Sequence, residues 1–364
     1  MNIHIKKRDR EPAYLQLYRA FVRDITNGVY PYGSKLPSKR IIAEETGISV
    51  ITAEHALTLL DEEGYVESRE RSGVFVIYKA EDFLSAGEAP EEALPATNTQ
   101  FYDTGDFPFS IIAKTMRKVL LDYGDRILVK SPNHGCQELR NEISLYLARS
   151  RGLKIRPSQV IVGSGAEYLY GLIVQLLGTK NTYALEKPSY NKIREVYEAM
   201  GAKCEMLTMT ADGISSKELK KTKAKVLHVT PFNSYPTGVT AGISKKKEYL
   251  SWAGKNNAVI IEDNYDSELT VSRKLEDSLY SLRDGVDVIY LNTFSRTVAP
   301  SMRIGYMILP QSLEELFNKK LGFYSCPVPI FDQYVLAELI KNGDFERHLN
   351  RVRRKRRIDG ESIS

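Results

Sequence analysis

Two short apolar runs that bracket a polar loop constrain the fold of this 364-residue chain more than any other feature. The runs are VDVIYL, from residue 286, and IGYMIL, from residue 304. Both are rich in β-branched and aromatic residues, which predicts two buried strands of a parallel sheet. Open α/β sheets bind ligands beyond the carboxyl ends of their strands. The loop there offers hydroxyl and guanidinium groups, which predict an anion site, from Thr293, Ser295, Arg296 and Arg303.

From residue 100 onward, strand-like runs alternate with helical patterns, which predicts an α/β fold. QVIVGSGAEYLYGLIVQLL predicts a strand, a Gly-Ser-Gly turn and a helix. Four more runs predict strands that end in polar residues, namely NTYALEKPSY, KVLHVTPFNSYPTG, AVIIEDNYDSE and DVIYLNTFS. The three cysteines have neither metal-ligand nor disulfide spacing, and no run is long and apolar enough for a leader or a membrane span. We therefore expect a cytoplasmic protein with no metal site and no membrane partner.

The string TFSRTVAPSMRIGY resembles the cofactor-lysine loop of fold type I aminotransferases, in the form carried by the MocR subfamily of GntR transcription regulators. In that family the loop usually starts TFSK, and here Arg296 stands at the lysine position. In the enzymes this lysine forms a Schiff base with the aldehyde of pyridoxal 5′-phosphate and then moves a proton, and both tasks need a neutral nitrogen. A guanidinium has a pKa far above 7 and is therefore almost never neutral at pH 7. We therefore expect no catalytic residue at this position.

The resemblance extends from about residue 100 to residue 364 and implies a fold type I large domain with a mixed, mostly parallel sheet. It implies that pyridoxal 5′-phosphate, if bound, is held non-covalently. The chain stops within the helix that leads into the C-terminal small domain of the family, so we expect that small domain to be truncated. The positions that match cofactor-binding residues of the family are Ser164, Gly165, Ala166, Tyr190, Asn233, Asp263, Tyr265, Thr293, Ser295 and Arg303.

Each of these matches has a chemical reason. The turn at Gly165 opens a helix, whose free N–H groups and dipole suit a phosphate. The family's aromatic stacks on the pyridine ring and matches Tyr190, whereas the carboxylate of Asp263 matches the partner of the protonated ring nitrogen. Tyr265 matches the phenol beside the ring oxygen. A Gly-Ser-Gly turn alone, or acids at a helix start alone, would be ordinary structural features.

The N-terminal 78 residues predict a winged helix-turn-helix. Apolar residues at spacings of three and four predict a helix from Pro12 to Asn27, and two shorter helices follow, opened by serines at 38 and 49. YVESRERSGVFVIY then predicts a hairpin with a basic tip. LPSKR, the GIS turn, ALTLLDEEGY and RSGVFV resemble the GntR-family DNA-binding domain over nearly its whole length.

This resemblance implies a double-stranded DNA operator as partner, contacted by the third helix in the major groove. The expected contact residues are Lys35, Ser38, Lys39, Arg40, Ser49, Thr52, Arg69, Arg71 and Gly73. Residues 1–78 hold 11 basic and 11 acidic side chains, so affinity must come from their placement. The family commonly has an arginine where this chain has Val50, so we expect a different operator.

Residues 79–99 are rich in alanine and glutamate without a sustained period, which predicts an interdomain linker. The expected organisation is therefore 1–78 for DNA binding, 79–99 for the linker and 100–364 for the aminotransferase class I/II-like domain. The basic run from Arg347 to Arg357 is typical of a solvated helix face at a chain end, and no interleaved aromatic residues support the alternative of a nucleic-acid contact.

Three functions remain open from the sequence. The first is a transcription regulator whose aminotransferase-like domain binds pyridoxal phosphate, or a related phosphate-bearing effector, without chemistry. In the second, that domain is only a dimerisation scaffold, and in the third it is a working aminotransferase fused to a DNA-binding domain. The retained Asp263, Tyr265 and Arg303 favour the first over the second, and Arg296 disfavours the third. The family pairs across its cofactor sites, so we expect a homodimer.

Overall fold

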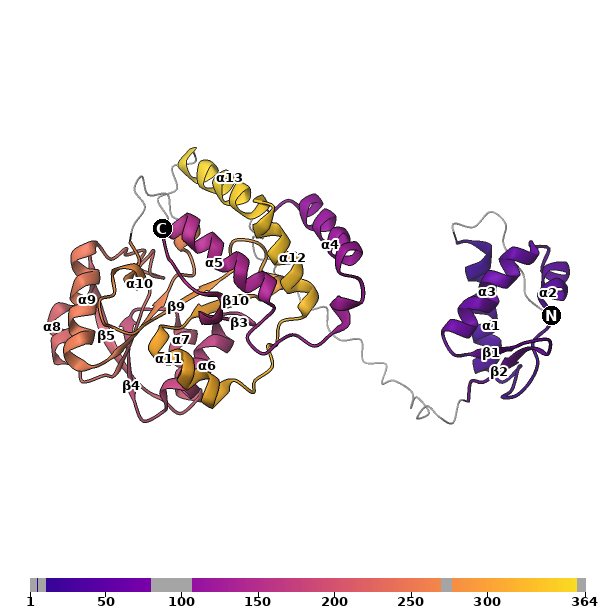
Figure 1. Cartoon of the computed structure of the whole chain (residues 1–364), viewed down its shortest axis with the longest axis horizontal. Helices are drawn as coiled ribbons and strands as arrows, with labels where there is room; N and C mark the ends of the chain where they lie inside the picture. Colours follow the sequence, from indigo (N-terminus) through magenta and orange to yellow (C-terminus); the bar gives the residue numbers. More distant parts are fainter. Residues whose placement is uncertain (1–4, 6–10, 80–106, 270–276, 359–364) are drawn as a thin grey trace. The chain divides into compact units, whose positions relative to one another are not determined.

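The computed structural model describes residues 5, 11–79, 107–269 and 277–358. The chain divides into two compact units, Met1–Thr99 and Gln100–Ser364 (Figure 1). Apart from Lys79, the linker that the sequence predicts lies outside the described residues.

The first unit holds three helices and a two-stranded sheet. Its helices are α1 (Ala13–Thr26), α2 (Lys39–Thr46) and α3 (Val50–Glu62), and its strands β1 (Val66–Arg69) and β2 (Gly73–Val76) are antiparallel. The side chain of Ser38 accepts the N–H of Ile41 at the start of α2, and Gly47 ends that helix in the left-handed conformation. Leu17, Phe21 and Leu60 are fully buried and form the centre of a core of their own.

The second unit is built on an eight-stranded sheet in the order β3-β10-β9-β8-β7-β4-β5-β6. The bounds are β3 (Val160–Gly163), β4 (Thr182–Lys187), β5 (Lys203–Thr210), β6 (Gly213–Ile214), β7 (Val226–Val229), β8 (Val259–Asp263), β9 (Val288–Thr293) and β10 (Gly305–Ile308). Strands β5, β4, β7, β8 and β9 run parallel. The expected mixed, mostly parallel sheet is confirmed.

One strand differs from its prediction. The run IGYMIL forms β10, which pairs antiparallel with both β9 and β3, so it is not a parallel strand. Only 11 residues separate β9 from β10, and they hold no crossover helix but a single 3-10 turn, Pro300–Met302. A parallel neighbour needs a crossover of a dozen or more residues, usually helical, whereas a short loop returns the chain in the opposite direction.

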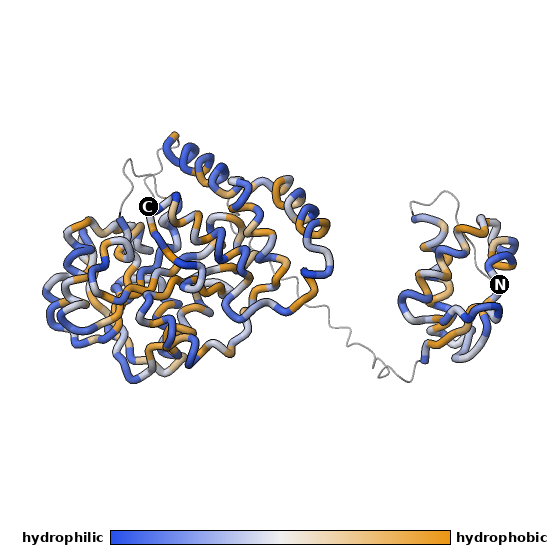
Figure 2. Tube along the Cα trace, in the orientation of Figure 1, coloured by the Kyte–Doolittle hydropathy of each residue, from blue (hydrophilic) through white to orange (hydrophobic). Residues whose placement is uncertain are grey.

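Successive side chains of the strands point to the two faces of the sheet and belong to two separate cores. Ile260 and Tyr290 join the core that includes α5, α9 and α12, whereas Ile261 and Leu291 join the core that includes α6, α7 and α11. The second unit therefore has three layers, helices on both faces of one sheet. Figure 2 shows hydrophobic residues concentrated in its interior and a mainly hydrophilic surface helix α13.

The helices of this unit are bounded as follows: α4 (Phe109–Tyr123), α5 (Gln137–Arg151), α6 (Ala166–Leu177), α7 (Asn191–Ala199), α8 (Ser216–Lys221), α9 (Ile243–Asn256), α10 (Leu279–Leu282), α11 (Gln311–Leu321), α12 (Ile330–Lys341) and α13 (Asp344–Ile358). Short 3-10 turns lie at Gly124–Leu128, Pro157–Gln159 and Ser267–Leu269. Over the part of the chain that the structure describes, no helix is both long and apolar enough to cross a membrane.

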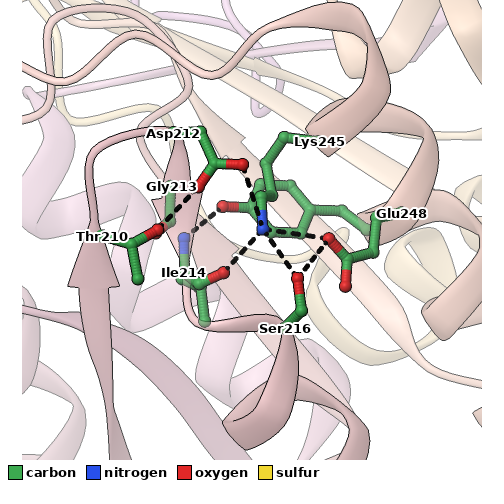
Figure 3. A network of polar contacts seen from close by, with 8 residues as sticks. Thr210, Asp212, Gly213, Ile214, Ser216, Lys245 and Glu248 are labelled. Carbon is green, nitrogen blue, oxygen red and sulfur yellow. Dashed lines mark hydrogen bonds and ion pairs between the residues drawn. The ribbon is translucent and has the colours of Figure 1, made fainter.

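The buried side chain of Lys245 on helix α9 connects this helix to β6 at the edge of the sheet (Figure 3). The Nζ atom of Lys245 donates to the carbonyl of Ile214 at 2.9 Å and to the hydroxyl of Ser216 at 3.0 Å, and it pairs with Glu248 at 2.9 Å. The hydroxyl of Tyr249 accepts the N–H of Ile214 at 2.7 Å. Because the buried charge has several polar partners, this contact is structural and fixes β6 in place.

Candidate functional site

A cavity of about 340 Å³ opens at the carboxyl ends of β7, β8 and β9, beside the start of α6. This is the place where an open α/β sheet binds its ligand. Its lining residues are Ala166, Glu167, Tyr170, Tyr190, Ile193, Thr230, Tyr235, Asp263, Tyr265, Thr293, Ser295, Arg296 and Arg303. Of the ten residues expected from the sequence, seven line this cavity, whereas Ser164, Gly165 and Asn233 do not.

Asp263 ends β8 and is almost fully buried, with its carboxylate held by neighbouring donors. The backbone N–H of Tyr265 donates to its Oδ1 atom at 3.2 Å, and the hydroxyl of Tyr170 donates to Oδ2. The imidazole Nε2 of His228 lies 3.6 Å from the same Oδ2, while His228 Nδ1 contacts the hydroxyl of Tyr197 at 2.7 Å. Burial raises the pKa of Tyr170 well above its usual range, so this phenol stays a donor. The carboxylate is thus fixed in orientation at the wall of the cavity.

We call the part of the cavity at the start of α6 the anion corner, because the helix N-terminus and Arg303 give it positive charge. Gly165 caps this 12-residue helix with φ +87°, a conformation that favours glycine. A Cβ atom at that position would lie 3.3 Å from Nη2 of Arg303, so the glycine also allows the guanidinium to approach. The first N–H groups of a helix have no partner within the helix and carry its positive dipole end. Helix N-terminus and guanidinium therefore attract the same anion.

A carboxylate already occupies part of this corner. Glu167 accepts a hydrogen bond from Nη2 of Arg303 at 3.2 Å and from Nζ of Lys192 at 2.9 Å. The hydrogen bond from Lys192 is the largest cause that lowers the pKa of Glu167. An incoming phosphate would meet two cations and one competing carboxylate here.

Arg296 lies at the cavity wall on the loop after β9. Its Nε is 3.4 Å from Oδ1 of Asp266, and its guanidinium carbon lies 5.6 Å from the centre of the Tyr265 ring. The amide of Asn233 donates to the other oxygen of Asp266 at 2.7 Å, and the phenol of Tyr265 donates to the carbonyl of Asn233 at 3.0 Å. Asn233 thus supports the site from behind instead of lining it. Burial is the main cause that raises the pKa of Tyr265 to about 12.

A second buried carboxyl lies behind the cavity. Glu186, at the end of β4, accepts the N–H of Thr230 at 3.1 Å and the hydroxyl of Ser234 at 2.6 Å. Burial raises its pKa to about 7. Thr230 itself lines the cavity, so Glu186 holds the backbone of the cavity wall through this hydrogen bond.

Sequence reasoning missed several lining residues, chiefly Glu167, Tyr170, Thr230 and Tyr235. Tyr170 follows Ala166 by four positions on a predicted helix, so helical spacing could have identified it. Tyr235 lies on the loop after β7, and its ring centre is 6.5 Å from that of Tyr190. No local pattern brings these two loops together.

The expected DNA-contact residues lie on α2 and α3 or at their N-caps, on the hairpin, and, in the case of Lys35, on the segment before α2 that pairs with Phe75 of β2. The hydroxyls of Ser49 and Thr52 are 2.7 Å apart, and Ser49 also accepts the N–H of Thr52, so Ser49 caps α3. Lys39 pairs with Glu54 on α3 at 2.6 Å. At the wing, Lys35 and Arg69 lie over the ring of Phe75, and a Cβ atom at Gly73 would collide with the Lys35 side chain.

Four described non-glycine residues have positive φ angles, namely Arg71, Asn233, Asn257 and Arg303. Three of them were singled out from the sequence as site residues. Sparsely populated backbone conformations outside glycine persist where surrounding structure holds them, often at functional sites. The wing tip, the loop after β7 and the anion corner each contain one.

Comparison with known proteins gives two family matches. Residues 13–76 match the bacterial regulatory proteins of the gntR family, and residues 96–360 match aminotransferase class I and II. The HTH-type transcriptional regulator YdeL of Bacillus subtilis (strain 168) is 35% identical over 94% of this chain and 76% of its own length. The probable rhizopine catabolism regulatory protein MocR of Rhizobium meliloti is 27% identical over 94% of this chain and 74% of its own length.

The solved structures that resemble this chain include aminotransferases. LysN, an α-aminoadipate aminotransferase of Thermus thermophilus complexed with N-(5′-phosphopyridoxyl)-L-leucine, superposes with a TM-score of 0.60 and 25% identity. The match covers 68% of this chain and 64% of LysN, so the chain spans less than two thirds of the length of that enzyme. The archaeal alanine:glyoxylate aminotransferase gives a TM-score of 0.61 at 25% identity, with 66% of this chain and 62% of the enzyme covered.

Proposed function

Because the chain belongs to the gntR family of bacterial transcription regulators, in the MocR group that joins an aminotransferase-like domain to the DNA-binding domain, we propose that its second unit is a non-covalent receptor for pyridoxal 5′-phosphate or a closely related phosphate ligand. Ligand binding at the cavity would regulate binding of the first unit to a DNA operator.

The donor set of the cavity supports this ligand. The helix start at Ala166, together with Thr293, Ser295 and Arg303, offers the hydroxyl, N–H and guanidinium donors that a phosphate monoester accepts. Asp263 offers a fixed carboxylate for a protonated ring nitrogen. Tyr190 and Tyr235 provide aromatic surface at the rim. When bound, pyridoxal phosphate supplies an electrophilic aldehyde, while these residues bind and orient it.

The single observation that carries the non-covalent part of the proposal is the guanidinium of Arg296 at the cavity wall. It lies beside Asp266, and a charged guanidinium is neither a nucleophile nor a proton acceptor at neutral pH. A carbonyl ligand can therefore be bound here without being joined to the chain at this position. Such a domain could regulate DNA binding through ligand binding alone, without catalysing transamination.

The first unit supports the regulatory half of the proposal. Its third helix is capped at Ser49 and exposes Val50 and Ile51 at its start, while Arg69 and Arg71 extend from the hairpin. This is the arrangement in which a helix reads the major groove and a wing contacts the backbone. We propose a homodimer on a two-fold or direct-repeat operator, because two reading helices double the DNA contacts.

The experiment combines binding with chemical trapping. The full chain and its Arg296→Lys variant are equilibrated with pyridoxal 5′-phosphate, treated with borohydride, digested and mapped by mass spectrometry. We expect both proteins to retain the ligand in equilibrium dialysis against excess free lysine, and only Arg296→Lys to carry a reduced adduct at position 296.

The outcomes separate the three functions. If the wild-type protein retains no ligand in dialysis, the result favours a second unit that serves only as a dimerisation scaffold. A trapped adduct on the wild-type cavity, or steady turnover of an amino donor, makes it an aminotransferase and overturns the proposal. Gel-shift titration with fragments of the surrounding genomic DNA, with and without ligand, tests the regulatory half.

A further inference from the structure

Two cationic side chains line the cavity, and they differ in what surrounds them. Arg303 belongs to the anion corner, where Glu167 accepts one of its hydrogen bonds. Arg296 lies on the loop between β9 and the turn that precedes Arg303, and it pairs with Asp266 instead of Glu167. A phosphate monoester has one site of strong negative charge, so the corner at Arg303 accounts for it. The second cation then faces a different part of the ligand.

The ion pair of Arg296 presents its positive member to the cavity. The side chain of Arg296 is 46% exposed, whereas that of Asp266 is 0% exposed. Asp266 is held behind the guanidinium by the hydrogen bond from Asn233. A ligand in the cavity therefore meets the guanidinium and is shielded from the carboxylate that pairs with it.

The guanidinium also has donors to offer. Its contact with Asp266 runs through Nε, and the Tyr265 ring restrains it from one side. Within the described residues, neither Nη nitrogen of Arg296 has a hydrogen-bond partner. Two N–H-bearing nitrogens in one plane are the geometry that binds a carbonyl or carboxylate oxygen.

We propose that Arg296 makes the receptor selective for phosphorylated ligands that carry an oxygen substituent, an aldehyde, alcohol or carboxylate, where aminated forms carry an ammonium group. The inference rests on the proposed function and names the class of ligand that the same cavity takes. The position that holds the lysine in the enzymes thus distinguishes ligands with an oxygen substituent from ligands with an ammonium group.

The physical basis is a difference between two charge environments. A primary amine on a flexible carbon has a pKa near that of lysine and is an ammonium at pH 7, so it offers only donors and a like charge to Arg296. A carbonyl or hydroxyl oxygen accepts from the same Nη groups. The carboxylate that pairs with Arg296 cannot compensate, because the side chain of Asp266 is fully buried. Like charges brought together in a partly desolvated site disfavour the complex strongly.

The test uses two ligands that cannot condense with any lysine of the chain, pyridoxine 5′-phosphate and pyridoxamine 5′-phosphate. They differ only in a hydroxyl against an ammonium group. Dissociation constants are measured by isothermal titration of the full chain at pH 7.5. We expect wild-type protein to bind the alcohol about tenfold or more tightly than the amine, and pyridoxal 5′-phosphate at least as tightly as the alcohol.

The variant Arg296→Gln removes the charge and keeps a planar donor, and we expect it to bind both ligands within about twofold of each other. Arg126→Gln is the matched control, because Arg126 pairs with Glu138 at 2.8 Å on the surface, is 62% exposed and does not line the cavity. This control should keep the wild-type ratio of the two constants.

Each outcome separates the inference from the proposed function. If wild-type protein binds none of the phosphorylated ligands, the proposed receptor function fails. If it binds alcohol and amine equally well, or if Arg296→Gln keeps the wild-type ratio, the receptor stands and the selectivity role of Arg296 is wrong. If Arg296→Gln loses all binding but retains the wild-type thermal midpoint, Arg296 is an anchor for every ligand and not a selector.

Discussion

At the scale of single residues, Glu186 is a carboxyl group that the fold keeps away from water behind the ligand cavity. Burial raises its pKa to about 7, and its two hydrogen bonds only partly oppose that rise. In an unfolded chain a glutamate has a pKa of about 4.3. Between these two values the folded state binds more protons than the unfolded state, so the free energy of unfolding falls as the pH rises.

We therefore predict that raising the pH from 5 to 8 destabilises the second unit through Glu186, by an amount on the order of 3 kcal/mol. Glu186→Gln, which stays neutral and can still accept from Thr230, should flatten that part of the pH dependence. Thermal midpoints measured at several pH values compare the two proteins. Glu198→Gln, at a side chain 53% exposed on α7, serves as control, and an equal slope in all three proteins would contradict the prediction.

The residue scale also shows why part of the site could be predicted. Asp263, Thr293 and Arg303 end or follow apolar strands, and strand ends are where ligands of such sheets bind. Glu167 was missed because its role depends on Lys192, 25 positions away, and on Arg303, 136 positions away. Charge pairs between separate elements leave no periodic signal in the sequence.

At the scale of elements, helix α3 presents apolar side chains where a guanine-reading arginine is common in the family. Val50 opens the helix and is 40% exposed, and Ile51 beside it is 79% exposed. Exposed aliphatic side chains at the start of a reading helix suit contact with the methyl group of thymine. Glu54 farther along the helix is held by Lys39 from α2.

We predict that Val50→Arg changes operator preference toward guanine at one position of each half-site, with a discrimination of about 1 to 3 kcal/mol. Selection from random duplexes, followed by gel-shift titration of the selected sites, measures the change. Val29→Arg adds the same charge at a side chain that is 64% exposed and lies outside α3. It should raise general affinity without a new base preference, and an unchanged preference in Val50→Arg would refute the assignment.

The direction of β10 could not be predicted at the element scale from composition. Its composition is that of a buried strand whether its neighbours are parallel or antiparallel, because both faces are covered by helices. The direction of β10 depends instead on the length of the loop that precedes it. The short connection after β9 permits only an antiparallel return, and the residues of the strand itself say nothing about that length.

At the scale of the whole chain, each unit has a core that it does not share. Among the residues that the structure describes, the buried members of the core of the first unit run from Leu17 to Val76, with Phe21 and Leu17 at 0% exposure. The buried residues of the two cores of the second unit begin at Phe107 and at Ile161. A helix-turn-helix with its own buried centre needs no other domain in order to fold.

We accordingly predict that residues 11–79, expressed alone, unfold cooperatively. Replacing the buried Phe21 by Ala should cost about 3 to 5 kcal/mol and abolish that transition at ordinary temperature. Val29→Ala, at an exposed position, should change stability by less than about 0.5 kcal/mol. Circular dichroism during heating measures all three chains, and a non-cooperative wild-type transition would show that the unit depends on the rest of the protein.

The C-terminal helix α13 adds one more connection. Arg353 donates to the carbonyl of Glu268 at 2.6 Å, and Arg356 donates to the carbonyl of Leu269 at 3.2 Å. Those carbonyls belong to the turn just after Asp266, on the segment that also carries Asp263 and Tyr265. The two arginines thus tie α13 to the segment that carries Asp263 and Tyr265, so a displacement of α13 would shift two residues that line the cavity.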